Sequence, residues 1–282
     1  NSLDPSYLTS ADNIVLRESG RISFRKGLKQ KVVPSGTAIN SIVEHNDQGT
    51  NKIFASHGTS IYTIDFTSPN AAFPSSGADV KRTVANSTGD WQFVNFNNRL
   101  TCLHTGIVPQ RYDGSASAGS MWAAFDNATR PPTVSTGEFK PSCGSGTYGR
   151  MWVGGVEEEK DVLHYSALLD SDDYTTSSGG GSIDLKRVWD KDDIIAIAPF
   201  YGQLAVFGKN NIALYASTDV IGNIKLNEVI KGIGCIARDS VQAIGDDLVF
   251  LSSTGLRSLA RTSEKDKVPL TDISKNIKDT II

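Results

Sequence analysis

Acidic residues are the first candidates for chemistry in this chain, because glycosidases use two carboxyl groups that flank the sugar bond. The clusters that offer such pairs are Glu157 to Glu159 with Asp161, Asp170 with Asp172 and Asp173, Asp192 with Asp193, and Asp246 with Asp247. Nearly all of them lie in predicted turns between strands, where acidic side chains are ordinarily solvated. A reactive carboxyl group requires burial or a neighbour of like charge. We therefore expect solvated turn residues here, not a catalytic pair.

The residues that could bind a metal lack the spacing of a metal site. The stretch Asp170-Ser171-Asp172-Asp173 resembles half of a calcium loop, but the glycine and the distal glutamate of such a loop are missing. The histidines, His45, His57, His104 and His164, never stand two or four residues apart. His57 and His104 occupy nearly equivalent repeat positions, which favours packing or a turn contact over ligation. The sequence predicts no metal and no cofactor.

The candidate nucleophiles are equally isolated. Cys102, Cys143 and Cys235 are far apart and form no CxxC pair, so neither a disulfide framework nor a zinc site is expected. Cys102 aligns with apolar positions of other repeats and is predicted to be a core residue. The chain has no G-x-S-x-G motif, and Gly179–Gly181 lacks the lysine and threonine of a phosphate-binding loop. We expect no enzymatic activity.

One basic segment near the N-terminus has the charge of a binding surface. Its cations are Arg17, Arg21, Arg25, Lys26, Lys29 and Lys31. Glu18 is the one acidic residue among them. Such a cluster is able to engage phosphates or an acidic protein surface. The alternative is a solvated hairpin whose charges keep a sheet edge from aggregating.

The composition of the chain limits its class. It has 282 residues, a net charge of −3 and 26 glycines. This charge is too small to indicate a nucleic-acid or membrane partner, and no apolar run approaches the ~18 residues of a membrane-spanning helix. Short apolar runs between polar turns are typical of many short strands. The chain begins with asparagine and ends in an apolar run, so we expect a fragment of a longer protein.

Elements that could position these side chains recur along the sequence. Five hairpin-like segments, each an apolar run, a turn and a second apolar run, start at residues 51, 98, 149, 202 and 246. This spacing matches the period of about 40–50 residues of four-stranded propeller blades. Further strand-like runs precede three of the hairpins, at residues 91–96, 194–197 and 240–244. The repeat predicts an all-β fold, a β-propeller of five or six blades.

The remaining segments are assigned around this repeat. The N-terminal hairpin at residues 13–28 and the C-terminal segment are expected to close the ring, within a single domain spanning residues 1–282. Isoleucines recur every four residues at Ile273, Ile277 and Ile281, which predicts a short C-terminal helix over 270–282 leading towards a further module. The predicted linkers are residues 113–120, 127–146 and 170–182.

The tryptophans divide into two groups. Trp91 and Trp152 lie within strand-like runs and are predicted to be core residues. Trp122 and Trp189 flank loops, where they could face a partner.

Several stretches, taken in order, resemble the tail nozzle, or tubular tail protein, of short-tailed bacteriophages and the related packaged-DNA stabilisation proteins. The first is Asp12–Arg17 followed by Gly20–Gly27, which resembles the hairpin that opens those propellers. The others are Arg150–Gly155 with Leu163–Ser166 and Asp170–Tyr174, Phe200–Phe207, and Gly232–Cys235 with Leu248–Leu256. Each motif is degenerate by itself, and their order carries the resemblance.

The resemblance implies a structural role in the virion. It implies a hexameric ring of copies of this chain below the portal and adaptor, contacts with other tail proteins, assembly in the bacterial cytoplasm, and genomic DNA passing through without sequence readout. It implies no catalytic residues, cofactor or membrane. The segment from Arg17 to Lys31 is then a candidate assembly surface.

Two other function classes remain open. One is an extracellular propeller that binds or cleaves carbohydrate, with carboxylates and Trp122 or Trp189 around a central pocket. The other is an interaction scaffold of the WD or kelch kind, although the WD dipeptide occurs once, at Trp189-Asp190, outside the repeat register.

Overall fold

The computed structural model describes residues 14–16, 22–24, 32–34, 38–64, 71–73, 80–117, 120–216 and 224–260. Most of these residues lie in antiparallel sheets whose strands follow one another in chain order. The sheets are numbered here as blades one to five. In each of them, a tight turn joins the first strand to the second.

The first two blades have four strands each. Blade one contains β4 (Ser41–Asp47), β5 (Thr50–His57), β6 (Ser60–Ile64) and β8 (Val80–Thr83). Blade two contains β9 (Gln92–Phe96), β10 (Arg99–His104), β11 (Ile107–Asp113) and β12 (Trp122–Ala124).

The next two blades also have four strands, and blade five has three. Blade three contains β13 (Cys143–Thr147), β14 (Arg150–Gly154), β15 (Val162–Tyr165) and β16 (Gly181–Asp184). Blade four contains β17 (Ile194–Phe200), β18 (Gln203–Gly208), β19 (Asn211–Ala216) and β20 (Lys225–Lys231). Blade five contains β21 (Gln242–Ile244), β22 (Asp247–Ser252) and β23 (Gly255–Ser258).

Short elements accompany the blades. β1 (Ile14–Leu16) pairs with β2 (Ile22–Phe24) in antiparallel fashion, and β3 (Val32–Pro34) pairs with β7 (Ala71–Phe73) in parallel. The helical turns are α1 (Lys186–Trp189), η2 (Asn127–Thr129), η3 (Thr176–Ser178) and η4 (Arg238–Ser240).

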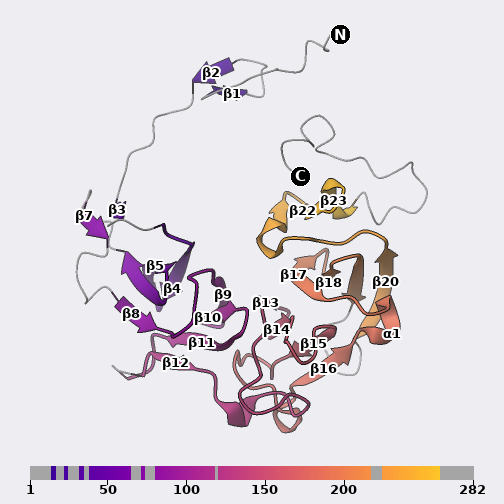
Figure 1. The fold of residues 1–282 in the computed structure, drawn as a ribbon, viewed down its shortest axis with the longest axis horizontal. Helices are drawn as coiled ribbons and strands as arrows, with labels where there is room; N and C mark the ends of the chain where they lie inside the picture. Colours follow the sequence, from indigo (N-terminus) through magenta and orange to yellow (C-terminus); the bar gives the residue numbers. More distant parts are fainter. Residues whose placement is uncertain are drawn as a thin grey trace.

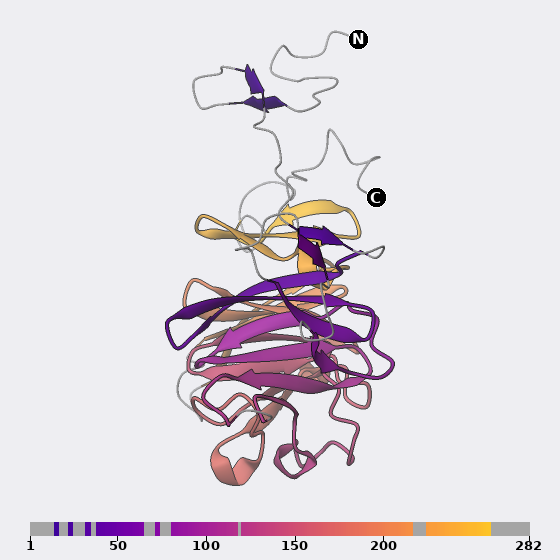
Figure 2. The same ribbon diagram turned by 90° about the vertical axis from the view of Figure 1, so that its left-hand side faces the viewer.

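The first strands of the blades lie innermost. β4 contacts β9, β9 contacts β13, and β13 contacts β17. The sheets follow one another around a common centre (Figure 1). In the side view the strands of successive blades run across the molecule in stacked layers (Figure 2). The fold is a β-propeller.

Hydrophobic packing joins each blade to the next. Four clusters of buried residues each contain side chains from two successive blades. They contain Phe54 and Leu100 for blades one and two, Leu103 and Met151 for two and three, Trp152 and Val206 for three and four, and Phe207 and Phe250 for four and five. Blades two, three and four therefore bury both faces against their neighbours. Among the described residues, the fifth cluster contains blade-one strand residues with Ile39, and none joins blade five to blade one.

The predicted hairpins are confirmed. They are the second and third strands of the five blades, and the runs predicted to precede them are the innermost strands β9, β17 and β21. Trp91 and Trp152 are buried core residues, as predicted, and so is Cys102. The basic residues from Arg17 to Lys31 and the predicted helix over 270–282 lie outside the described residues.

Two predicted linkers extend too far at their C-terminal ends. The predicted linker 127–146 ends inside β13, the innermost strand of blade three, and the predicted loop 170–182 runs into β16. Trp189, which sequence analysis offered as a loop-flanking residue that could face a partner, ends α1 and is buried in the cluster between blades three and four.

Sequence analysis did not predict β13, because this strand is rich in glycine. A Cβ atom on Gly144 would stand 2.7 Å from Leu103 Cδ1 and 2.8 Å from the Trp152 carbonyl oxygen. A Cβ atom on Gly146 would stand 2.8 Å from Phe96 Cβ and 3.1 Å from the Asn95 carbonyl oxygen. The glycines thus allow blade two to approach blade three, at the cost of strand propensity.

We expect Gly146→Ala to lower the free energy of unfolding by about 1–3 kcal/mol, because the added methyl group must displace neighbouring backbone. Ser145→Ala, a half-buried position of the same strand, is the matched control and should change it by less than about 0.5 kcal/mol. Urea unfolding followed by tryptophan fluorescence measures both. Equal stability of the two variants would contradict the close approach of the blades.

Candidate functional site

An axial cavity of about 410 Å³ lies where the innermost strands begin. Its walls are residues 40–43 from the start of β4, 90–93 from the start of β9, 196–198 from the middle of β17, and 238, 239, 241 and 242 from η4 and β21. The pocket therefore draws on four blades at once. Pockets between several elements are common places for ligand sites.

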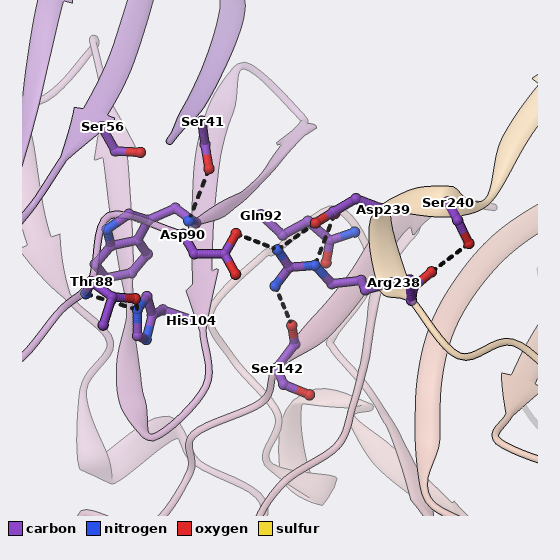
Figure 3. A network of polar contacts seen from close by, with 12 residues as sticks. Ser41, Ser56, Thr88, Asp90, Gln92, His104, Ser142, Arg238, Asp239 and Ser240 are labelled. Carbon is purple, nitrogen blue, oxygen red and sulfur yellow. Dashed lines mark hydrogen bonds and ion pairs between the residues drawn. The ribbon is translucent and has the colours of Figure 1, made fainter. Parts of the chain in front are cut away.

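Arg238 is the charged centre of this cavity (Figure 3). Its Nη1 donates to the carbonyl oxygen of Ser142 at 3.0 Å, and its Nη2 contacts Asp90 Oδ1 at 3.3 Å. Nε and Nη2 donate to the two carboxylate oxygens of Asp239, at 2.9 and 2.8 Å. The side chain is 13% exposed. One guanidinium thus links blade five to blades two and three across the axis.

This arrangement is suited to holding blades together. The guanidinium remains charged at any physiological pH, so it neither gives nor takes a proton. Its donors are committed to Asp90, Asp239 and Ser142, and both carboxylates are largely exposed. The axial cluster is therefore a structural link between blades.

A second polar cluster joins blade two to the long loop of blade three. Arg99 Nη1 donates to Asp170 Oδ1 at 3.1 Å and to Asp172 Oδ1 at 2.9 Å, while its Nε donates to Asp113 at 3.0 Å. Arg111 Nη1 lies 2.9 Å from Asp172 Oδ2. The prediction of solvated turn residues is therefore wrong for Asp172, whose side chain is 16% exposed and paired with two arginines.

The electrostatics of the pair Asp170 and Asp172 are coupled. Burial raises the pKa of Asp172 to about 6, and its hydrogen bond with Asp170 adds to the shift against the opposing effect of Arg111 and Arg99. Although burial opposes it, hydrogen bonding from Asp172 lowers the pKa of Asp170. Asp172 is therefore the member of the pair whose carboxyl group takes up a proton at mildly acidic pH.

The pair predicts a pH-dependent stability. Because the pKa of folded Asp172 is about 6 against an ordinary 3.8, folding is coupled to proton uptake, and stability is lost as pH rises through this window. Asp172→Asn removes the uptake. As the pH falls from 7 to 4, we expect the free energy of unfolding of the wild type to rise by about 1–3 kcal/mol relative to that of this variant. Denaturant unfolding at four pH values measures the difference.

Asp193→Asn makes the same chemical change on an exposed turn and is the control. Its stability difference from the wild type should stay nearly constant over the same pH range. A constant difference for Asp172→Asn as well would contradict the raised pKa of Asp172.

A third polar cluster lies between blades one and two. Lys52 Nζ donates to Asp47 Oδ2 at 2.5 Å and to the Tyr112 hydroxyl at 2.7 Å, and that hydroxyl donates to Asp47 at 2.8 Å. The hydrogen bond from Lys52 lowers the pKa of Asp47, while burial raises the pKa of Tyr112. Tyr112 therefore remains a protonated donor. Sequence analysis missed this set, because its members stand in three different strands.

The histidines and cysteines lie in packing roles. His57 and His104 contact loop backbone, as predicted, His57 at the Ala38 carbonyl and His104 at Thr88 and the Thr105 carbonyl. The three cysteines are buried and unpaired with one another. Burial raises the pKa of Cys143 to about 12, so it is not poised as a nucleophile.

The described residues contain no group of three or more metal-binding side chains. At residues 170–173, which resemble half of a calcium loop, Asp172 forms ion pairs with Arg99 and Arg111. Within the same described part of the chain, no helix has the length and apolar character to cross a membrane.

Comparison with known proteins gives fold similarity alone. No protein-family model and no curated protein matches the chain. Among solved structures, Raptor of Chaetomium thermophilum has a TM-score of 0.51 at 13% identity, covering 86% of this chain and 22% of its own.

Two bacterial structures are also similar. The extracellular domain of a putative hybrid two-component system of B. thetaiotaomicron has a TM-score of 0.47 at 12% identity, with 89% of this chain and 36% of that one covered. PorZ, a surface component of the type-IX secretion system of Porphyromonas gingivalis, has a TM-score of 0.44 at 13% sequence identity. The similarity covers 87% of this chain and 28% of PorZ. The chain thus spans about a third or less of the length of these three structures.

Proposed function

We propose that the chain is a non-catalytic structural subunit of a bacteriophage tail, part of a nozzle ring around the DNA-ejection channel. The observation that carries the proposal is the use of charged groups across blades. Asp172 is held between Arg99 and Arg111, and Arg238 is held by Asp90 and Asp239. Charged side chains that fix one blade against the next support a structural role.

The order of the sequence motifs supports the same proposal. Several of the stretches that resemble nozzle proteins fall on strands β14 and β15, on the end of β17 with β18, and on the hairpin of β22 and β23. Others, at residues 170–174 and 232–235, lie in connections between strands. Because their order follows the blades, the match supports a shared framework.

Exposed apolar side chains give the subunit a surface for assembly. Leu168 and Leu169 of blade three are 58% and 57% exposed, and Tyr201 of blade four is 64% exposed. The neighbouring Tyr148 hydroxyl donates to the Gln203 carbonyl, which brings the turns of these two blades together. Clustered exposed apolar groups mark protein–protein contacts.

Virions of a phage that encodes this chain provide the test. An antibody against residues 120–216 is expected to label the tip of the tail in immunogold electron microscopy, and peptides of the chain should be found in purified particles. Particles that lack the chain would overturn the proposal. Arg21→Glu combined with Arg25→Glu then asks whether the basic segment is an assembly surface, with reduced incorporation as the expected result.

A further inference from the structure

A groove lined by amide side chains lies between blades one and two, at the turns that connect their first and second strands. Its volume is about 520 Å³. The asparagines that line it are Asn46, Asn51, Asn95, Asn97 and Asn98, together with Glu44, His45, Phe96 and Arg99. Neither the axial cavity nor the ion-pair cluster around Asp172 accounts for this concentration of amides.

Turn geometry explains only part of the asparagine content. Asn97 and Asn98 have positive φ angles of 47° and 58°, a conformation that asparagine tolerates. Asn51 and Asn95 instead lie within strands β5 and β9, where asparagine is depleted. Their presence in strands requires another reason.

Hydrogen bonds fix the orientation of these amides. Asn46 Nδ2 donates to Asn51 Oδ1 at 2.9 Å, and Asn51 Nδ2 donates to Glu44 Oε1 at 2.8 Å. Asn95 Nδ2 donates to the Glu44 carbonyl at 2.9 Å, and its Oδ1 accepts from His45 Nδ1 at 2.7 Å. This set of hydrogen bonds, called the relay below, holds each amide in place before any ligand binds. Less conformational entropy is therefore lost on binding.

The relay leaves both donors and acceptors open. Each Nδ2 group carries a second proton. Among the described residues, neither Glu44 Oε2 nor the Asn98 amide has a hydrogen-bond partner. The groove therefore presents amide donors beside a carboxylate acceptor. Hydroxyl groups fit such a surface, because each of them both donates and accepts.

The charge and shape of the groove narrow the ligand class. Arg99 is committed to Asp113, Asp170 and Asp172, so it offers little to an anion, and Glu44 repels one. The ring of Phe96 packs toward blade three beside Gly146, so the groove offers a ligand the polar groups of its amides and of Glu44. We propose that this groove binds a neutral glycan.

This site differs in place from a central carbohydrate pocket with Trp122 or Trp189. Trp189 is buried in the core, and Trp122 packs against Phe54 and Tyr112 with centroid distances of 5.3 and 5.1 Å. The proposed site uses oriented amides in place of an indole platform.

The test uses an array of neutral and anionic oligosaccharides, including maltohexaose, cellohexaose and bacterial O-antigen repeats, with the strongest neutral hit titrated by calorimetry. Glu44→Gln and Asn98→Gly are the test variants, since glycine keeps the positive φ at residue 98. Each is expected to weaken binding about tenfold. Asn210→Ala, an exposed turn asparagine of blade four, is the matched control and should bind as the wild type does.

Three results would overturn the proposal: no neutral sugar bound at millimolar concentration, binding of anionic glycans or peptides alone, or equal binding by Glu44→Gln and the wild type. Circular dichroism of each variant establishes that it is folded. Incorporation of the chain into virions is a separate readout, because a propeller without a glycan site can still assemble.

Discussion

Trp152→Ala is expected to lower the free energy of unfolding by about 3–5 kcal/mol, which is a large share of the stability of an ordinary domain. Trp152 is completely buried in the cluster between blades three and four. Its ring centroid lies 5.3 Å from that of Tyr165, and its Nε1 donates to the Thr147 carbonyl at 3.1 Å. Alanine would leave a cavity between two sheets that cannot collapse independently and a carbonyl without its donor.

Equilibrium unfolding in urea, followed by circular dichroism, measures this loss. Trp152→Phe is the graded control: it keeps most of the apolar volume and loses only the indole donor, so we expect about half the effect or less. If the alanine variant fails to fold, the phenylalanine variant still reports on the site. A loss below about 1 kcal/mol for the alanine variant would contradict packing of the two blades through Trp152.

Arg238→Ala has the second largest expected effect: it should lower the free energy of unfolding by about 2 kcal/mol. Most of this loss comes from the Ser142 carbonyl oxygen, which no longer accepts the hydrogen bond that Arg238 Nη1 donates at 3.0 Å. The carboxylates of Asp90 and Asp239 are largely exposed and return to water at little cost. Asp90→Asn is therefore the matched control, with an expected change below about 1 kcal/mol.

Hydrogen exchange locates the effect. Without the guanidinium, amides of β13 beside Ser142 and of β21 beside η4 should exchange faster, because the link between blades two, three and five is broken. Amides of β20, the outer strand of blade four, should keep their rates. Uniform acceleration across all blades, or none at β13, would show that Arg238 does not act as an axial link.

Both predictions concern contacts between blades, and they illustrate what the sequence determined by itself. The hairpins at residues 51, 98, 149, 202 and 246, the runs that precede them and the all-β class follow from local information. Short apolar runs bounded by glycine and asparagine turns specify strand pairs without reference to distant residues. Their period is enough to indicate a propeller.

Only the tertiary structure decided which charged residues meet. Arg99 and Asp172 are separated by 73 positions, and Arg238 and Asp90 by 148. In the sequence Asp172 looks like a solvated turn residue, because its arginine partners come from a different blade. β13 shows the same limit for packing: its glycines predict a linker, and only the neighbouring sheet shows why glycine is needed at Gly144 and Gly146. Spacing along the chain sets strand pairing, whereas closure of the blades around the axis sets burial, charge pairing and the walls of each cavity.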